Sequence, residues 1–227
     1  MTHMPAFPPL REDALARAGA ILTIDVGAIV ANWRLLAQKV APAECAAVVK
    51  ADAYGLGADP VATALLADGC RTFFVAHLEE GIALRRLLPR TVRICVLHGP
   101  MPGTEADFTA HDLLPVLNSL EQVEGFSRHA AAAGRKLPAL LQTDTGMSRF
   151  GLAPSELDRL IETDALANLD IVLHMSHLAC ADDPANPANP AQRAAFEAVR
   201  ARLPGVPASL SASSGIFLGP DYHFDLV

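Results

Sequence analysis

The chain has 227 residues, 51% of them hydrophobic, which suits one compact domain with a sizeable core. Its formal net charge is -7, and acidic and basic residues are interspersed, so it offers no basic stripe for nucleic acid and no polybasic segment for a membrane surface. The apolar residues come in short blocks, none approaching the roughly 20 residues of a membrane helix, and residues 1–19 lack the apolar segment of a secretory signal. We therefore expect a cytoplasmic protein with a small-molecule ligand, no nucleic acid partner and no membrane association.

Short apolar runs rich in Val, Ile and Leu recur along the chain and are typical of buried strands. The expected strands cover residues 46–50, 72–75, 93–97, 114–117, 139–143, 171–174 and 208–211. Segments of helical periodicity separate them, which is the pattern of βα units around a parallel sheet. Because the strands recur every roughly 25 to 35 residues, we predict an α/β fold of the (β/α)8 TIM-barrel type.

Capping residues indicate where the intervening helices begin and end. Asp59 is expected to cap a helix that has Pro60 at its first position and Gly69 at its end. Ser119 with Gln122 predicts a capping box for a helix that closes at Gly134. The remaining helices are expected to open at Ser155 with Asp158, and to span residues 79–88 and 190–203.

The two ends of the chain fit the barrel less well. The eighth strand is expected at residues 224–227, so the barrel would be truncated in or just before completion of this strand, with an unpaired edge beside the first strand. Residues 20–25 alternate like a strand and precede a helix with apolar Ile29, Trp33 and Leu36. This early strand has no obvious partner within the barrel.

Polar side chains gather at the expected carboxyl ends of the strands, where parallel barrels carry their functional groups. Lys50 ends the first strand, Arg149 follows the fifth, and His177 follows the sixth. After the seventh come the hydroxyl cluster and glycine of residues 211–215, whose backbone N–H groups and hydroxyls suit a phosphate. These residues together predict a binding site at one end of the barrel.

Each of these residues also has a structural interpretation. Lys50 could be a surface lysine that lays its stem along the strand, but its apolar neighbourhood favours the neutral amine that forms an imine with an aldehyde cofactor. Tyr54 fits a core aromatic about as well as a phosphate contact. Arg149 could cap the following helix region or pair with a substrate carboxylate.

The sequence offers little for a metal or a disulfide. His174 and His177 form an H-x-x-H, but a spacing of three on an extended segment sends the rings to opposite faces, so we expect no metal site. No C-x-x-C pair occurs, so we expect Cys45, Cys70, Cys95 and Cys180 to be reduced. Cys45 and Cys95 lie in or beside apolar strand patterns and are expected to be structural rather than nucleophilic.

Five motifs, in order along the chain, resemble the N-terminal part of the alanine racemases, which use pyridoxal phosphate. They are Ile24-Asp25 with Asn32-Trp33-Arg34; Ala47 to Gly57; Asp144 to Arg149; His177 to Asp182; and Ser213 to Ile216 running on to residues 222–227. The resemblance covers residues 21–227. It identifies residues 1–227 as a pyridoxal phosphate-binding barrel domain, in which residues 20–25 would join a C-terminal β-domain.

The resemblance implies a role for each candidate residue. Lys50 would hold pyridoxal phosphate as a Schiff base and act as one of two bases on the substrate Cα. Tyr54 and Ser213 would hold the phosphate, Leu97 and His177 would lie against the cofactor ring, and Arg149 would stand near the substrate carboxylate. The implied activity interconverts L-alanine and D-alanine, which supplies D-alanine for peptidoglycan.

The sequence also departs from the family pattern. The opposite-face base of the family is a tyrosine of the C-terminal β-domain, supplied by the partner subunit of a homodimer, and residues 1–227 contain neither that domain nor the family's Arg-Pro-Gly segment. Ala212 stands in place of an asparagine, Gln142 in place of a frequent lysine and Leu56 in place of a histidine. We therefore expect weak or no racemisation, and no assured dimer, from this chain alone.

Two other functions remain open from the sequence. A single-domain carrier that binds pyridoxal phosphate without racemising amino acids would suit the length, although such a protein completes its eighth strand. A structural barrel with a fortuitous lysine would carry no cofactor on Lys50 at all.

Overall fold

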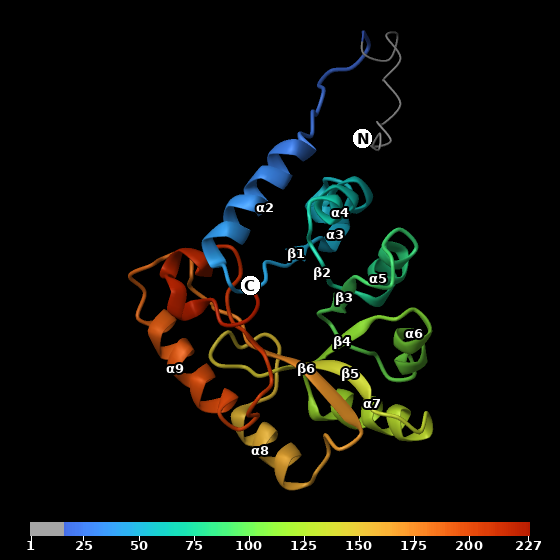
Figure 1. Cartoon of the computed structure of the whole chain (residues 1–227), viewed down its shortest axis with the longest axis vertical. Coiled ribbons are helices and arrows are strands. Elements are labelled where there is room, and N and C mark those ends of the chain that lie inside the picture. Colours follow the sequence, from blue (N-terminus) through green and yellow to red (C-terminus); the bar gives the residue numbers. More distant parts are fainter. Residues whose placement is uncertain (1–15) are drawn as a thin grey trace.

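The computed structural model of the chain describes residues 16–227, which form an α/β domain (Figure 1). The strands are β1 (Ala47–Val48), β2 (Thr72–Val75), β3 (Arg93–Val96), β4 (Leu114–Leu117), β5 (Leu137–Gln142), β6 (Leu169–Met175) and β7 (Ala208–Ser209). The helices are α2 (Val26–Val40), α3 (Lys50–Gly55), α4 (Ala58–Ala67), α5 (Leu78–Arg85), α6 (Glu105–Ala110), α7 (Leu120–Ala132), α8 (Pro154–Glu162) and α9 (Ala188–Arg200), with short 3-10 helices η1 (Gly215–Leu218) and η2 (Pro220–Tyr222).

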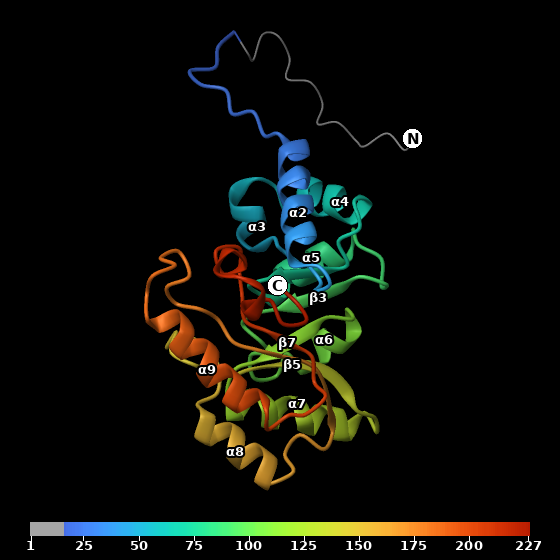
Figure 2. The same ribbon diagram turned by 60° about the vertical axis from the view of Figure 1, so that its left-hand side comes forward.

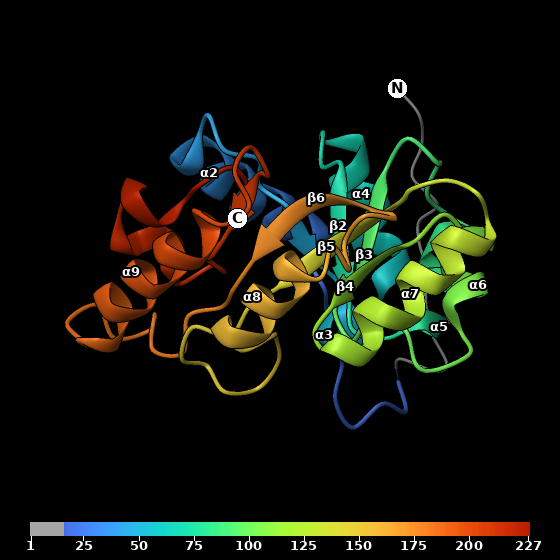
Figure 3. The same ribbon diagram turned by 90° about the horizontal axis from the view of Figure 1, so that it is seen from below.

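The seven strands form one parallel sheet in the order of the sequence, and the sheet curls into part of a barrel. Helices α4 to α9 lie around its outer side (Figure 1), and Figure 3 shows α5, α6 and α7 along the strands from below. The predicted alternation of strands and helices is therefore confirmed. The sequence places β2 and β4 at their observed bounds, whereas β1 is shorter than predicted because Lys50 opens α3 instead of ending the strand.

Four helix starts differ from the prediction: α5 and α9 begin slightly earlier than expected, and α4 and α8 differ for identifiable reasons. Helix α4 begins at Ala58, whose N–H is accepted by the carboxylate of Asp52 at 2.6 Å, so Asp59 lies inside the first turn and is not the cap. Helix α8 begins at Pro154, because proline suits a first helical position, and Ser155 lies within the helix. Half of the predicted capping box of α7 is confirmed, since the Ser119 side chain accepts the N–H of Gln122. The Gln122 side chain accepts the N–H of Asn118 at 2.8 Å rather than that of Ser119.

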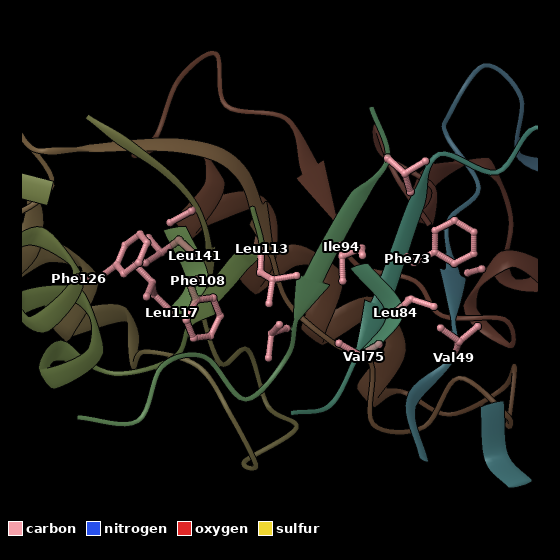
Figure 4. Close-up of a cluster of buried hydrophobic side chains, with 14 of the residues drawn as sticks. Val49, Phe73, Val75, Leu84, Ile94, Phe108, Leu113, Leu117, Phe126 and Leu141 are labelled. Carbon is pink, nitrogen blue, oxygen red and sulfur yellow. The ribbon is translucent and has the colours of Figure 1, made fainter. Parts of the chain in front are cut away.

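The sheet has a core on each face. The larger one lies between the strands and the surrounding helices, where Phe73 and Ile94 pack with Leu84 of α5 and Phe108 and Phe126 of α6 and α7 (Figure 4). Fully burying one such side chain contributes roughly 1.5–3 kcal/mol to folding. The concave face carries a second layer, formed by Phe74, Cys95, Val116, Leu140, Leu173, Met175 and Leu226.

The end of the chain covers part of the predicted open edge. Leu226 bridges Glu44 on one side and Ser209 on the other, and the N–H of Ala46 donates to the carbonyl of Val227 at 2.8 Å. Residues 225–227 thus lie between β1 and β7 through isolated bridges, without forming a regular strand. The expected open edge is therefore partly covered: Glu44 and Ala46, just before β1, bond to residues 225–227, whereas Ala47 and Val48 of β1 pair with β2.

Helix α2 stands beside this closure (Figure 2). As the sequence predicts, Trp33 and Leu36 face inward, packing near Ile216 and Val227, and the Trp33 indole donates to the carbonyl of Cys45 at 3.2 Å. Residues 20–25 form no strand here, and Leu22 is 79% exposed. Within residues 16–227, no helix combines the length and apolar character needed to cross a membrane.

Candidate functional site

The predicted site residues lie along the carboxyl ends of the strands, which we call the rim. Lys50 opens α3, two residues after the end of β1. Val48 pairs with Phe74, whose ring belongs to the concave core. Lys50 is half-buried at the top of this layer, with its Nζ 5.8 Å from the centre of the Tyr54 ring.

Lys50 is followed by a turn of left-handed backbone. The four residues Ala51 to Tyr54 have φ between 51° and 58°, although none is glycine. Each such residue costs of order 1 kcal/mol, so the turn persists only because its surroundings hold it. Within it, Ala53 N–H donates to Val49 at 3.0 Å and Gly57 N–H donates to Asp52 at 2.9 Å. The turn brings Tyr54, whose side chain is exposed, back toward Lys50.

A single carboxylate organises the loop that carries Arg149. Oδ1 of Asp144 accepts the N–H groups of Gly146, Met147 and Ser148 at 2.9, 2.9 and 3.0 Å. Gly151 has φ +108°, and a Cβ there would lie 2.7 Å from the backbone nitrogen of Asp144, so only glycine fits. The loop is therefore tightly folded, and it presents Arg149 as an exposed cation at the rim.

His177 lies in the segment after β6. Burial lowers the pKa of His177 below its usual 6.5, and the positive charges of Arg149 and of Lys50 lower it further. Gln192 of α9 fixes the segment by donating to the His177 carbonyl at 3.0 Å and accepting the Ala179 N–H at 2.8 Å.

Leu97 lies on a loop that is clamped from the neighbouring βα unit. Asn118 donates to the Leu97 carbonyl at 2.9 Å, and Gln122 donates to the His98 carbonyl at 2.8 Å. Gly99 has φ +69° and would place a Cβ only 2.4 Å from the Val116 carbonyl oxygen, so the two strand ends approach as closely as glycine permits. Leu97 itself is half-buried against the concave core.

Aromatic rings continue the rim between these loops. The rings of His77 and His98 lie 5.0 Å apart, and His98 meets the ring of Phe150 edge-on at 5.3 Å. Arg149 stands over the same Phe150 ring at 5.9 Å. This row links the loops after β2, β3 and β5 into one continuous surface.

Ser213 is less closely tied to this group. It is exposed and lies after β7, where Ser211 donates its hydroxyl to the Tyr222 carbonyl at 2.8 Å and Gly215 packs so closely that a Cβ would lie 2.5 Å from the Ser211 oxygen. In the part of the chain that the structure describes, no hydrogen bond or ion pair joins Ser213 to Lys50 or Tyr54. Its predicted contact with a phosphate stays a prediction.

His174 points away from the rim. Its Nε2 lies 2.7 Å from the Thr143 hydroxyl, its ring packs against Phe196 of α9, and burial followed by the charge of Arg200 lowers its pKa to about 4. The two histidines of the H-x-x-H therefore occupy different environments. Across residues 16–227 no group of three or more potential metal ligands is assembled.

The cysteines are free, and three of them are buried. Burial raises the pKa of Cys45 to about 11 and the pKa values of Cys70 and Cys95 to about 12. These thiols are protonated at neutral pH and serve as small core residues, as the sequence predicts for Cys45 and Cys95.

Comparison with known proteins agrees with this geometry. Residues 24–227 match the family model described as alanine racemase, N-terminal domain. The chain belongs to this family. It is 54% identical over 210 residues to the alanine racemase of Brucella ovis, covering 92% of this chain and 53% of that protein, and 53% identical over 212 residues to that of Rhodospirillum rubrum, covering 92% and 57%.

A solved member of the family has the same fold. The crystal structure of alanine racemase from Bartonella henselae with covalently bound pyridoxal phosphate superposes with a TM-score of 0.87 at 47% identity, covering 90% of this chain and 60% of that one. The chain spans about half the length of the curated relatives it matches.

Three residues that shape the rim were not predicted as functional residues from the sequence. Asp144 was visible only as part of a motif, Gln122 only as a helix cap, and Gln192 not at all. The sequence feature that the three share is an amide or carboxylate side chain in a loop or on a helix beside the strand ends. That signal becomes informative only when the backbone groups they reach are known, and those groups lie up to 24 residues away.

Proposed function

We propose that this domain binds pyridoxal phosphate through Lys50 and belongs to an alanine racemase that interconverts L-alanine and D-alanine. The observation that carries the proposal is the placement of Lys50, Arg149 and His177 after β1, β5 and β6, at the carboxyl ends of one parallel sheet, in a chain whose family is established. We further propose that residues 225–227 begin the eighth strand of a (β/α)8 barrel and that residues 20–25 belong with a second domain. The complete protein would form a homodimer and work in the cytoplasm.

The groups at the rim fit the cofactor chemically. An amine suits the cofactor aldehyde, the half-buried Leu97 and His177 suit the faces of an aromatic ring, and the phenol of Tyr54 with the hydroxyl of Ser213 suits the phosphate. His177 is kept uncharged at neutral pH by its lowered pKa, so it can lie against a ring without adding a buried charge. When bound, pyridoxal phosphate supplies an electron sink that stabilises the negative charge left on the substrate Cα after deprotonation.

The residues of this chain would prepare one face of that reaction. Lys50, fixed on its turn, would remove or return the Cα proton from its own side. The guanidinium of Arg149, held by the loop that Asp144 organises, would orient the substrate carboxylate through its paired donors. The ring row of His77, His98 and Phe150 would limit the access of water beside them.

Racemisation also needs a proton donor on the opposite face. The chain has two tyrosines: Tyr54 belongs to the same turn as Lys50, while Tyr222 lies in η2 with its ring under Arg193. Neither offers that donor, and the family resemblance assigns it to the partner subunit's β-domain. We therefore expect the 227-residue chain by itself to racemise alanine weakly or not at all. The relatives described above are racemases, which disfavours a carrier without such activity.

The proposal can be tested directly because the chain has three lysines, Lys39, Lys50 and Lys136. The purified chain is incubated with pyridoxal phosphate, reduced with borohydride and mapped by peptide mass spectrometry. We expect the pyridoxyl label on Lys50, with Lys39 and Lys136 as internal controls. Equal labelling of all three lysines, or none on Lys50, would reject a cofactor site at the rim.

A further inference from the structure

Glu80, on the first turn of α5, holds backbone from two different loops. Its Oε1 accepts the N–H of Ala51 at 2.7 Å, and its Oε2 accepts the N–H groups of Ala76 and His77 at 2.7 and 3.0 Å. The contacts to Ala76 and His77 belong to the β2–α5 connection and to the start of α5. The contact to Ala51 crosses to the turn after Lys50, 29 residues away in the chain.

The Ala51 N–H belongs to the peptide unit that joins Lys50 to Ala51. Fixing this unit fixes ψ of Lys50, while the N–H of Val49, which donates to Phe74 at 2.9 Å, holds the chain just before it. The direction of the Lys50 side chain therefore depends on two anchors, one in the sheet and one at Glu80. The second anchor lies where the backbone enters its left-handed stretch.

Glu80 is suited to this role as a carboxylate. Burial by itself would raise its pKa, but the three backbone donors outweigh burial and hold the pKa of Glu80 below its usual value. Charge-assisted hydrogen bonds of this kind are stronger than neutral ones. Its neighbour Glu79 is exposed on the same helical turn. The two glutamates have the same side chain, but Glu80 accepts three backbone N–H groups.

We propose that Glu80 is a positioning residue for Lys50, which ties the left-handed turn to the β2–α5 loop and thereby directs the lysine amine toward the cofactor. The inference rests on the proposed function of Lys50. The support that Glu80 gives to the turn is nevertheless a property of the protein without cofactor, and it can be measured separately.

Glu80→Gln tests the link selectively. A glutamine has one acceptor oxygen, which we expect to face the two donors of Ala76 and His77, so that the cap of α5 survives while the Ala51 N–H meets an amide NH2 group. Glu79→Gln removes the same charge from the same turn and serves as the matched control. Glu80→Ala removes the cap as well, and shows how much of any effect comes from α5.

The first measurement is hydrogen exchange on the chain without cofactor. We expect the Ala51 amide to be protected in the wild type and in Glu79→Gln, and to exchange faster in Glu80→Gln. An Ala51 amide that exchanges at the unprotected rate in the wild type would overturn the proposal without any variant. Thermal melting identifies a variant that has merely unfolded.

The second measurement is the visible absorbance that pyridoxal phosphate acquires when its aldehyde condenses with a lysine, titrated against cofactor concentration, with borohydride mapping of Lys50. In Glu80→Gln we expect affinity to fall about tenfold, which corresponds to roughly 1.4 kcal/mol and to the loss of one charge-assisted hydrogen bond. Wild-type affinity in a folded Glu80→Gln would overturn the proposal. If the wild type takes no label on Lys50, the proposed function fails, whereas the exchange data still decide whether Glu80 holds the turn.

Discussion

The loops after β1 and β5 both present a cation at the rim, but they are held in different ways. The loop after β5 is held mainly from within, because Asp144 accepts N–H groups of the loop itself and Gly146 and Gly151 occupy tight positions, while the Thr145 hydroxyl adds one bond to Ser176. The turn after β1 places four non-glycine residues in left-handed backbone and depends on Glu80, which lies outside it. Arg149 therefore stands on a loop that its own sequence specifies, and Lys50 stands on one that the neighbouring βα unit completes.

The largest expected effect comes from Lys50→Ala. We expect complete loss of the visible band and of the pyridoxyl label, because Lys39 lies on α2 and Lys136 precedes β5, so that neither follows a strand; Lys39→Ala and Lys136→Ala should keep both. The readouts are absorbance and peptide mapping. A pyridoxyl label that persists at the rim in Lys50→Ala would mean that the turn after β1 does not carry the cofactor.

Acid should lower the stability of the protein through His174, whose ring bonds Thr143 at the start of the loop after β5. The folded-state pKa of His174 is about 4, below its usual 6.5, so the unfolded chain binds the proton more readily. The stability that the neutral His174 contributes is therefore fully present above pH 6.5 and is lost as the pH falls toward 4. The loss is roughly 3 kcal/mol. Urea unfolding at several pH values measures this loss. His174→Leu is the control, because it removes the titrating ring and leaves the carboxylates unchanged. Equal pH dependence of the two free energies of unfolding would contradict the assignment of the loss to His174.

Two glycine substitutions compare the loops directly. Gly151→Ala should destabilise the protein by about 3 kcal/mol, because the new Cβ meets backbone and φ is +108°. Gly55→Ala in the Lys50 turn has φ +85° but open space around it, so we expect about 1 kcal/mol. Chemical denaturation gives both values, and a larger cost at Gly55 would reverse the view that the β5 loop is the more tightly packed of the two.

The smallest effect is expected for Asp144→Asn. The asparagine keeps one oxygen for the N–H groups of Gly146 and Met147 but loses the charge, so we expect about 1 kcal/mol of destabilisation. Asp170→Asn, at an exposed position on β6, is the control and should change little. The same denaturation experiment serves, and an effect of Asp144→Asn no larger than that of the control would show that the loop does not depend on this carboxylate.

The strands, their order and the ends at which the candidate site residues gather follow from the sequence by itself. Apolar blocks of four or five residues separated by capped helical segments indicate βα units, since burial and helix capping are local properties that a short window of residues expresses. For the same reason local patterns were enough to locate Lys50, Arg149 and His177 at the strand ends, and the residues of the motifs identified the family.

Tertiary structure alone decided how these residues are held. The left-handed turn after Lys50 contradicts the local preference of its four residues. The side chains that support the rim, Glu80, Gln122 and Gln192, each make a hydrogen bond to a backbone group 13 to 29 residues away. The contacts of residues 225–227 with Glu44 and Ser209 likewise join the beginning of the sheet to its end. Hydrogen bonds between distant segments depend on which backbone groups the fold leaves unpaired, and no local pattern in the sequence records that.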